Sequence, residues 1–521
     1  MLPPLIEALL KAECYPHPVA RIELVETHIS WVLLTGQYAY KIKKPVDLGF
    51  LDFSTLDKRR HFCEEELRLN RRLAPQIYLE VVPVTGNADS PRLGGAGEAI
   101  EYAVKMRQFA QDMQLDRVLA RGDLTSAHID SLAEELARFH GSVLVAGPDV
   151  SFGEPAAVLA PMQENFEQIR PRVDTGLHDM LARVEHWTQA SYQQLVPVLA
   201  ERKRAGFVRE CHGDAHLANM ALLGDEVLLF DCLEFNDNLR WIDVVSELAF
   251  AAMDLDDRGR EDLAWRLINR YMEHTGDYAG LRLLRFYQVY RALVRAKVAA
   301  IRLGQSAIGK DERTQASETM RGYLALAERY TRAGKPGLLI THGLSGSGKT
   351  FVTQGLVESL GAVRIRSDVE RKRLHGLAAE ARSGSGIASG LYAESATRET
   401  YAHLEALART VVQAGLTVIV DATFLKRAQR RLFAGLADML GVPFVVLSMH
   451  ATERALRERI ASRHASGRDA SEAGLDVLTH QLANLERLGP EERTLVIVVD
   501  TEIPLASGAL EQALRARLGA T

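Results

Sequence analysis

Apolar runs and helical segments alternate in the last third of the chain. Strand-like apolar runs lie at 338–342, 363–366, 416–420, 444–449 and 495–499. Strands that alternate with helices are typical of a parallel α/β sheet. The segment RAGKPG at 332–337 supplies Gly and Pro between this region and a long helical stretch before it. The pattern predicts a linker at 333–336 and an α/β domain with a parallel sheet at 337–521.

The first 330 residues follow a different order. β-rich segments lie at 21–25, 30–35 and 38–43, and further strands are expected near 77–84 and 99–106. Between these groups we expect a helix from Ser54, as its N-cap, to about Leu73. Residues 112–205 and 241–330 are mostly helical, and the apolar hairpin ALLGDEVLLFD separates them. A small sheet followed by a larger helical region predicts a bilobal α+β domain over residues 1–332.

Composition and charge narrow the class of protein. Hydrophobic residues make up 47% of the 521 residues and charged residues 25%, as in an ordinary globular protein. The formal net charge of -5 gives no overall nucleic-acid footprint. The four cysteines form no C-x-x-C pair, which indicates reduced thiols and no zinc site. The first residues lack a basic region, and no apolar run approaches the ~20 residues of a membrane span. We therefore expect a cytoplasmic protein without a membrane partner.

Residues 343–350 read GLSGSGKT, a complete P-loop pattern between a strand and a helix. In such a loop, backbone N–H groups and the helix N-terminus face the phosphates of a nucleotide. The lysine reaches the β- and γ-phosphates, and the hydroxyl after it binds Mg²⁺. The motif predicts ATP and Mg²⁺ as cofactors, bound by Gly343, Ser345, Gly346, Ser347, Gly348, Lys349 and Thr350.

The sequence that follows the P-loop contains five further candidate functional residues. Asp368 follows the second strand and Arg371 comes one helical turn later, whereas Asp421 ends the strand TVIVD. Arg459 and Arg463 share one face of an Arg-rich helix, where like charges repel by a few tenths of a kcal/mol unless an anion lies between them. Simpler interpretations remain: Asp368 as a helix N-cap, Asp421 as a strand end, and the two arginines as a solvated helix face.

Together these elements resemble the small-molecule and polynucleotide kinase branch of P-loop proteins, which includes polynucleotide 5′-kinases, zeta-toxin-like kinases and chloramphenicol phosphotransferases. The resemblance implies that Asp368 is the base facing the acceptor hydroxyl and that Arg371 anchors the substrate. It implies that Asp421 serves the Mg²⁺ and water network. It also implies a lid at about 459–473, in which Arg459 and Arg463 cover the transferring phosphate.

A second constellation lies in the first part of the chain, where residues 212–219 read HGDAHLAN. Asp214, Asn219 and then Asp231 follow the order of the catalytic-loop and metal-binding residues in protein-kinase-like enzymes. That chemistry needs a carboxylate near the acceptor hydroxyl and two oxygen ligands for Mg²⁺. With Gly213 in second position, residues 20–330 resemble the aminoglycoside phosphotransferase-like superfamily.

This resemblance implies an N-terminal bilobal kinase-like fold. Lys41, on the third strand, would bind phosphates, and Glu66 would be its ion-pair partner, with Glu64 and Glu65 as rivals. The same resemblance implies that Asp243 is a structural residue. The fold class of the whole chain is then α/β multidomain, with a kinase-like α+β domain followed by a P-loop α/β domain.

Three observations leave alternatives open at this second site. Lys43 and Lys44 are close to Lys41 and fit exposed lysines at a strand edge. His216 is better explained as a supporting residue than as a metal ligand. No G-x-G-x-x-G is present, because the loop ETHIS at 26–30 lacks glycine and offers only hydroxyl donors.

The sequence predicts an ATP-dependent bifunctional phosphotransferase acting on alcohol groups. The N-terminal site would act on a small-molecule hydroxyl, and the C-terminal site on a small molecule, a nucleotide or a polynucleotide 5′-hydroxyl. One alternative is an ATP-gated regulatory protein with an N-terminal pseudokinase. Another is a nucleic-acid repair factor, which the nearly balanced charge of 337–521 disfavours. Basic clusters at 364–373 and 426–431 could hold a phosphorylated acceptor.

Overall fold

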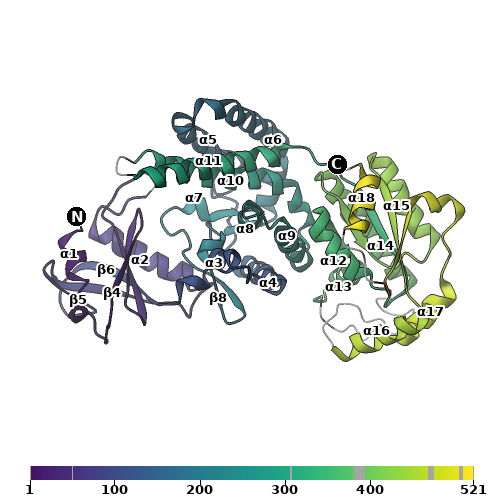
Figure 1. The fold of residues 1–521 in the computed structure, drawn as a ribbon, viewed down its shortest axis with the longest axis horizontal. Helices are drawn as coiled ribbons and strands as arrows, with labels where there is room; N and C mark the ends of the chain where they lie inside the picture. The colour runs from purple at the N-terminus through teal and green to yellow at the C-terminus, as the bar shows by residue number, and fades with distance from the viewer. Residues whose placement is uncertain are drawn as a thin grey trace. The chain divides into compact units, whose positions relative to one another are not determined.

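The computed structural model describes residues 2–49, 51–305, 308–379, 381, 393–466, 474–503 and 508–519, without the side chains of 463–466. By packing, the chain divides into two compact units. Figure 1 shows the helices and strands of the chain, coloured by residue number. Unit 1 comprises Met1–Asn165 and Tyr192–Asp254, and unit 2 comprises Phe166–Ser191 and Leu255–Thr521. The domain limits expected from the sequence follow chain order, whereas these units follow packing, so those limits stay a prediction.

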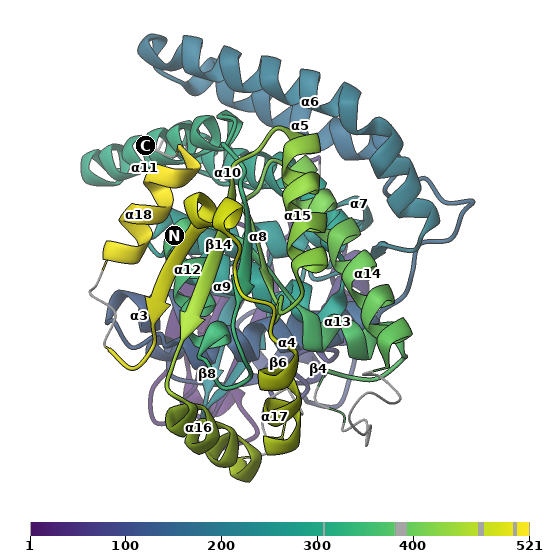
Figure 2. The same cartoon turned by 90° about the vertical axis from the view of Figure 1, so that its right-hand side faces the viewer.

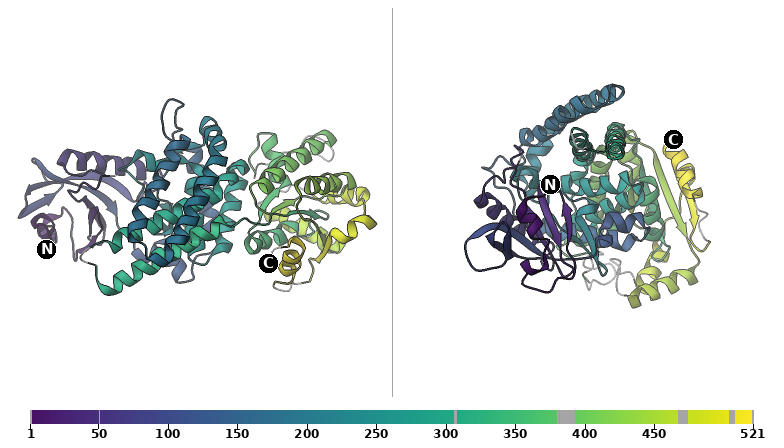
Figure 3. Two further views of the ribbon diagram at one scale, coloured as in Figure 1. Left: turned by 90° about the horizontal axis from the view of Figure 1, so that it is seen from above. Right: turned by 60° about the vertical axis from the view of Figure 1, so that its left-hand side comes forward.

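In the described part of the chain, unit 1 has a six-stranded antiparallel sheet with the order β1-β2-β3-β6-β4-β5 (Figure 3, in purple). Alternation along the central strand β3 puts Tyr40 and Ile42 in a hydrophobic cluster with helix α1, and turns Lys41 and Lys43 to the other face. Helix α2 packs on that second face. The elements are α1 (Pro4–Ala8), β1 (Glu23–Glu26), β2 (Ser30–Leu34), β3 (Tyr38–Lys43), α2 (Leu56–Asn70), β4 (Tyr78–Asn87), β5 (Ser90–Leu93) and β6 (Ala99–Arg107).

The rest of unit 1 is mostly helical, with two short antiparallel strand pairs, β7–β10 and β8–β9. The β8–β9 hairpin is the one expected from the sequence, and it brings Phe230 beside Asn219, whose carbonyl accepts the Phe230 N–H at 2.9 Å. The elements are α3 (Leu115–Ala120), α4 (Ser126–Ser142), β7 (Val208–Glu210), β8 (Met220–Leu223), β9 (Glu226–Leu229), α7 (Asp237–Arg240) and β10 (Trp241–Asp243). Helices that contribute to both units are α5 (Pro155–Ile169), α6 (His178–Arg204) and α8 (Val244–Asp257).

Unit 2 contains a parallel sheet whose strands, over the described ranges, have the order β12-β13-β11-β14-β15. Helices α12 and α18 share a buried apolar cluster with one face, whereas α14 and α15 pack together beside the other (Figure 2). The strands are β11 (Leu338–His342), β12 (Val363–Arg366), β13 (Val418–Asp421), β14 (Phe444–His450) and β15 (Val496–Asp500). The helices are α12 (Lys349–Leu360), α13 (Ser367–Leu374), α14 (Glu394–Gln413), α15 (Arg427–Leu440), α16 (Glu453–Ser466), α17 (Leu475–Asn484) and α18 (Ala509–Leu518).

Three further helices precede this sheet and belong to the same unit: α9 (Glu261–Thr275), α10 (Leu281–Leu303) and α11 (Lys310–Thr331). Helices α10 and α11 pack side by side, and α9 packs on α12 and β12. None of the helices in the described ranges has the length and apolar character needed to cross a membrane.

The predicted fold class is confirmed, with an antiparallel sheet and a helical lobe before a parallel P-loop sheet. One local prediction is wrong. The N-cap of α2 is Thr55, whose side chain accepts the Lys58 N–H at 3.3 Å, and not Ser54. The helix ends at Asn70, because residues 71–73 form a turn. The first part of the expected lid is helical, since α16 continues to Ser466, whereas 467–473 lie outside the described residues.

The four cysteines of the chain, Cys14, Cys63, Cys211 and Cys232, are buried thiols outside any disulfide, and all belong to unit 1. Burial raises the pKa of Cys63 and Cys232 to about 12. Unit 2 contains no cysteine.

Candidate active sites

The P-loop forms the turn between β11 and α12. Gly346 and Gly348 both have φ of 82°, and a Cβ at Gly346 would lie 2.8 Å from the carbonyl oxygen of Leu456. Glycine is therefore required at Gly346 by conformation and by space. Lys349 is the first residue of α12, and its Nζ donates to the carbonyl oxygens of Gly343 at 3.1 Å and Leu344 at 2.8 Å. The first N–H groups of a helix have no acceptor within it, so the start of α12 offers donors to an anion.

Thr350 and Asp421 meet although 70 residues separate them in the sequence. Thr350 Oγ1 donates to Asp421 Oδ2 at 2.8 Å. Asp421 ends β13, which pairs with β11, so the carboxyl ends of both strands meet beside the P-loop. Hydroxyl and carboxylate oxygens are ligands that Mg²⁺ accepts. The donor set fits the predicted metal ion, and the contact with Thr350 gives Asp421 more than the role of a strand end.

A cavity of about 440 Å³ adjoins the P-loop. Asp368 and Arg371 line it, with the Arg371 Nη1 3.7 Å from Asp368 Oδ1. Because the N-cap of α13 is Arg366, Asp368 does not cap this helix. Other lining side chains that matter for charge and polarity are those of Lys349, Thr350, Arg366, Tyr401, Asp421, Lys426, Arg459, His480 and Gln481.

Arg459 contacts the P-loop directly. Its Nη1 donates to the carbonyl oxygen of Gly346 at 3.3 Å and to Thr501 Oγ1 at 2.8 Å, and its Nη2 donates to the Thr501 carbonyl at 2.8 Å. These contacts exclude a solvated helix face for Arg459. The side chain of Arg463 lies outside the described residues, so its role stays a prediction.

Gln481, on α17, is a cavity residue that the sequence did not reveal. Its Oε1 accepts the Ser345 N–H at 2.8 Å, and its Nε2 donates to Ser345 Oγ at 3.0 Å. The contact joins α17 to the third residue of the P-loop motif. No local signal marks this glutamine, because only the tertiary contact distinguishes it from other polar residues on α17.

The second site, in unit 1, is built around two lysines on β3. Lys41 Nζ lies 2.8 Å from Glu66 Oε1 and 2.5 Å from Asp231 Oδ1. Lys43 Nζ contacts Glu66 Oε2 at 2.7 Å and also pairs with Glu234. Burial alone would lower the pKa of Lys41, but Asp231 and Glu66 raise it well above its ordinary value. Lys41 is therefore charged at neutral pH.

Two alternatives from the sequence are decided by these contacts. Among the three neighbouring glutamates, Glu66 is the partner of Lys41, whereas Glu64 pairs with Arg60 and Glu65 with Arg68. The idea that Lys43 is an exposed edge lysine is wrong, because β3 is a central strand and the Lys43 side chain is 0% exposed.

The loop after β7 carries Asp214 and Asn219. Asn219 Nδ2 donates to Asp214 Oδ2 at 2.9 Å, which leaves the amide oxygen of Asn219 for a cation. His216 Nε2 lies 3.3 Å from Asp214 Oδ2, and its ring packs edge-on against Phe250. These contacts support the interpretation of His216 as a supporting residue.

Asp231 enters the site from the β8–β9 hairpin. Its φ is 63°, in the left-handed region, and its N–H donates to the hydroxyl of Tyr78 at 3.1 Å. Non-glycine residues in this region cluster at functional sites. Asp231 is 45% exposed, so its carboxylate remains accessible beside Lys41. The oxygens of Asn219 and Asp231 fit the metal-binding role expected of them.

Glu247 on α8 is a second residue that the sequence analysis missed. Its Oε2 accepts the N–H of Gly213 at 2.7 Å, and its Oε1 lies 2.9 Å from His140 Nε2. Gly213 has φ of 89°, and a Cβ there would lie 2.8 Å from the carbonyl oxygen of Leu239. Glu247 therefore fixes the loop one residue before Asp214. Asp243, expected to be a structural residue, is buried and pairs with Arg202 at 2.6 Å.

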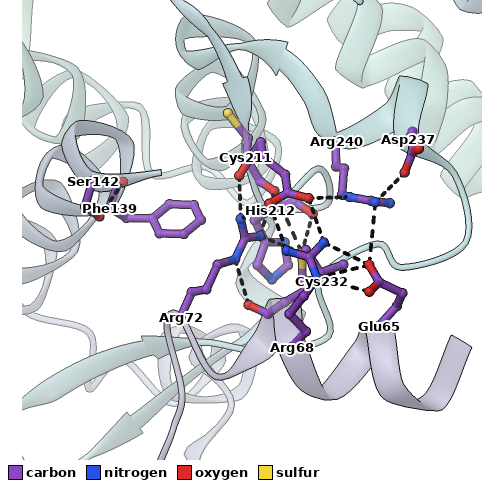
Figure 4. A network of polar contacts seen from close by, with 12 residues as sticks. Glu65, Arg68, Arg72, Phe139, Ser142, Cys211, His212, Cys232, Asp237 and Arg240 are labelled. Carbon is purple, nitrogen blue, oxygen red and sulfur yellow. Dashed lines mark hydrogen bonds and ion pairs between the residues drawn. The ribbon is translucent and has the colours of Figure 1, made fainter. Parts of the chain in front are cut away.

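Helix α2 is fastened to the strand that precedes the Asp214 loop (Figure 4). Arg72 donates to the carbonyl oxygens of Glu210 at 2.7 Å and Cys211 at 3.2 Å. Arg68 makes two further bonds to the Glu210 carboxylate, at 2.8 and 3.2 Å. This network holds α2, and with it Glu66, in register with the loop that carries Asp214.

The turn between β1 and β2 leaves no room for a glycine-rich phosphate loop. The Thr27 N–H donates to the Ser30 carbonyl at 2.9 Å, and Thr27 Oγ1 accepts the Ser30 N–H at 3.0 Å. The hydroxyl of Thr27 is thus used inside the turn, where the sequence had suggested a donor for phosphate.

Comparison with known proteins adds to this geometry. The family model described as an AAA domain matches residues 338–488, which contain the P-loop, Asp368, Asp421 and Arg459. The uncharacterized protein Rv2004c of Mycobacterium tuberculosis is 31% identical over 492 residues, covering 92% of this chain and 96% of the relative. The chain belongs to the Rv2004c family. The uncharacterized protein Mb2027c of Mycobacterium bovis matches to the same extent. Because these alignments span nearly the whole chain, the Rv2004c family includes both units.

Solved structures resemble separate parts of this member of the Rv2004c family. A choline/ethanolamine kinase family protein from Mesorhizobium loti covers 60% of this chain and 94% of its own, with 13% identity and a TM-score of 0.36. A gluconokinase from Sinorhizobium meliloti 1021 covers 36% of this chain and 92% of its own, with 23% identity and a TM-score of 0.25. At these identities and TM-scores, neither similarity bears on activity.

Proposed function

We propose that the chain is an ATP-dependent phosphotransferase with two sites, each of which transfers the γ-phosphoryl group of ATP to an alcohol. The observation that carries the proposal is the meeting of Lys349, Thr350 and Asp421 at one end of a cavity that also contains Asp368. Phosphoryl transfer depends mainly on positioning and on neutralising charge, and this arrangement supports both.

At the P-loop site, Lys349 and the first N–H groups of α12 bind the phosphates. Asp368 orients the acceptor hydroxyl and takes its proton, while Arg371, 3.7 Å from Asp368, anchors the acceptor. Arg459, next to Gly346, meets the charge of the transferring group. Mg²⁺, held by Thr350 and Asp421, would supply further charge neutralisation.

The acceptor of the P-loop site carries a negative charge in this proposal. Among the described residues that line the cavity, five side chains are cationic, those of Lys349, Arg366, Arg371, Lys426 and Arg459, and two are carboxylates, those of Asp368 and Asp421. Arg366 Nη1 lies 3.9 Å from the buried carboxylate of Glu273, which also pairs with Arg270 and Arg364. The excess of positive charge favours a hydroxy acid, a phosphorylated metabolite or a nucleotide over a neutral alcohol.

At the unit 1 site, Lys41 binds the phosphates while Glu66 holds it in place, and Asn219 with Asp231 would bind Mg²⁺. Asp214 accepts the proton of a small-molecule hydroxyl. Asp214 is 31% exposed, so an acceptor can reach it. The fastening of α2 to Glu210 supports a preformed arrangement that needs no activating partner.

The test is phosphoryl transfer from γ-labelled ATP by the full chain and by its Lys349→Ala and Asp214→Asn variants. Each acid or phosphorylated acceptor is paired with the neutral alcohol of the same carbon skeleton. We expect transfer to anionic acceptors to be lost in Lys349→Ala and retained in Asp214→Asn. Phosphoryl transfer by a variant that carries both Lys349→Ala and Asp214→Asn would contradict the proposal of two transfer sites. Equal use of anionic and neutral acceptors would contradict the proposed negative charge of the acceptor.

A regulatory role for unit 1 is the second candidate, and the closed Thr27–Ser30 turn favours it. Without a loop over the phosphates, ATP bound at Lys41 has fewer contacts with its γ-phosphate. In that case Asp214→Asn would change no transfer reaction, whereas Asp231→Asn would still weaken Mg-ATP binding by unit 1.

A further inference from the structure

Helix α9 packs on β12, which is the edge strand on one side of the parallel sheet in unit 2. The side-chain amide of Asn269 donates to the carbonyl of Ala362 at 2.9 Å and accepts the N–H of Arg364 at 2.7 Å. These are the two bonds that a neighbouring strand would make. At Gly361, with φ of 63°, a Cβ would lie 2.7 Å from the indole nitrogen of Trp265. The turn before β12 is thus fitted to α9.

The centre of this interface is an ion pair between two buried side chains. Glu273 Oε1 accepts from Arg364 Nη2 at 2.7 Å and from Nε at 3.2 Å, and the two side chains are 4% and 2% exposed. Burial alone would raise the pKa of Glu273, but Arg364, Arg366 and Arg270 lower it to about 2. The Glu273 carboxylate is therefore ionised at neutral pH, as a buried guanidinium requires.

Arg364 links this ion pair to the P-loop site. Its Nη1 donates to the carbonyl oxygen of Thr350 at 3.1 Å, and its Nη2 donates to Gln354 Oε1 at 3.0 Å, so the guanidinium contacts the first and second turns of α12. Thr350 is the residue whose hydroxyl meets Asp421. The other Glu273 oxygen lies 3.9 Å from Arg366, which lines the cavity.

We propose that Glu273 is a positioning residue of the P-loop site. Through Arg364 it fixes the backbone of Thr350, and through Arg366 it orders the acceptor side of the cavity. Helix α9 is then part of that site, although it precedes residues 338–488, which match the AAA domain family. The inference rests on the proposed function of the P-loop site. It requires that Mg-ATP binding and the docking of α9 stabilise each other.

The first test uses the full chain with Asp214→Asn, so that turnover reports the P-loop site. The double substitution Glu273→Leu with Arg364→Met removes both buried charges, and such replacements of a buried pair are often neutral for stability. We expect the double variant to melt near the parent temperature. Its kcat is expected to fall, and the Mg²⁺ concentration for half-maximal turnover to rise, each by about 10- to 100-fold.

Arg266→Met is the matched control. The Arg266–Glu358 ion pair, at 2.7 Å, joins α9 to the last turn of α12, whereas Arg364 contacts the first and second turns of that helix. Both constants should stay within about twofold of the parent in this variant. A folded double variant with the parent kcat and Mg²⁺ dependence overturns the inference.

Hydrogen exchange on the unsubstituted chain gives a test that does not depend on how the variants fold. Mg-AMP-PNP should slow amide exchange in 261–275, and this protection should disappear in Lys349→Ala. If Mg-AMP-PNP binds in a way that depends on Lys349 but does not slow amide exchange in α9, only the inference is overturned. Mg-ATP binding is also measured in a chain that carries Asp231→Asn, with and without Lys349→Ala. If Lys349→Ala does not alter this binding, the proposed function and the inference are both overturned.

Discussion

Lys41 and Lys43 lie two residues apart on β3 and face the same side of the sheet, yet their surroundings differ. Lys41 reaches the half-exposed Asp231, whereas Lys43 is enclosed between Glu66 and Glu234. The period of two along a strand predicts the shared face. It does not predict the partners, because Glu234 lies 191 residues away and meets Lys43 only through the packing of the two lobes.

Replacement by methionine should therefore affect a different property at each lysine, stability at Lys43 and ATP binding at Lys41. Lys43→Met leaves two buried carboxylates without their shared cation and should cost about 3–5 kcal/mol of unfolding free energy. Lys41→Met should mainly weaken Mg-ATP binding by unit 1, because Lys41 is the member of the pair that we propose to bind the phosphates. Denaturant unfolding and ATP titration of both variants measure the two effects.

Lys44→Met serves as the control, because Lys44 pairs with the exposed Glu26 and should contribute less than about 1 kcal/mol. An unfolding free energy for Lys43→Met equal to that of Lys44→Met would show that the buried cluster does not stabilise unit 1.

At the scale of elements, the parallel strands were predicted within a few residues, because apolar runs bounded by polar segments fix them. The parallel sheet followed from the alternation of these runs with helices, and the P-loop from its sequence motif, whereas the strand order was not predicted. The start of α2 was missed by one residue, since Ser54 and Thr55 are adjacent and both can cap a helix. The contact of α17 with the P-loop could not be predicted, because it depends on where one glutamine lies after folding.

Helix α16 offers a test of the proposed role of Arg459. If Arg459 acts on the charge that develops during transfer, Arg459→Ala should lower kcat by about 100-fold or more with little change in ATP affinity. Arg457→Ala is the matched control, because Arg457 lies on the same helix and pairs with the exposed Glu453. Steady-state transfer and ATP binding are measured on both. A lower ATP affinity at unchanged kcat would make Arg459 a ground-state contact instead.

At the scale of the molecule, the sequence assigned residues 241–330 to the kinase-like region because they continue its helical pattern. Packing groups Leu255–Thr521 together, since α9 covers β12 and the Arg266–Glu358 ion pair joins α9 to α12. These contacts join residues about 90 positions apart, so no local pattern announces them.

A fragment of residues 337–521 should accordingly be less stable than one of residues 255–521. The shorter fragment lacks Glu273 and Asn269, so Arg364 loses its carboxylate and β12 loses its edge bonds. The loss of about 3 kcal/mol corresponds to a melting temperature lower by roughly 10 °C. Calorimetry of both fragments checks this, and equal melting temperatures would show that α9 does not stabilise the sheet.

The distribution of cysteines gives the molecule a chemical label for one of its units. A thiol reacts as the thiolate, and burial keeps Cys63 and Cys232 protonated, with pKa values of about 12. All four thiols of the chain belong to unit 1 and are enclosed there. Alkylation by a thiol reagent therefore requires unit 1 to open, whereas unit 2 is not labelled because it has no cysteine. The labelling rate thus reports opening of the kinase-like unit alone, even in a chain whose P-loop unit melts first.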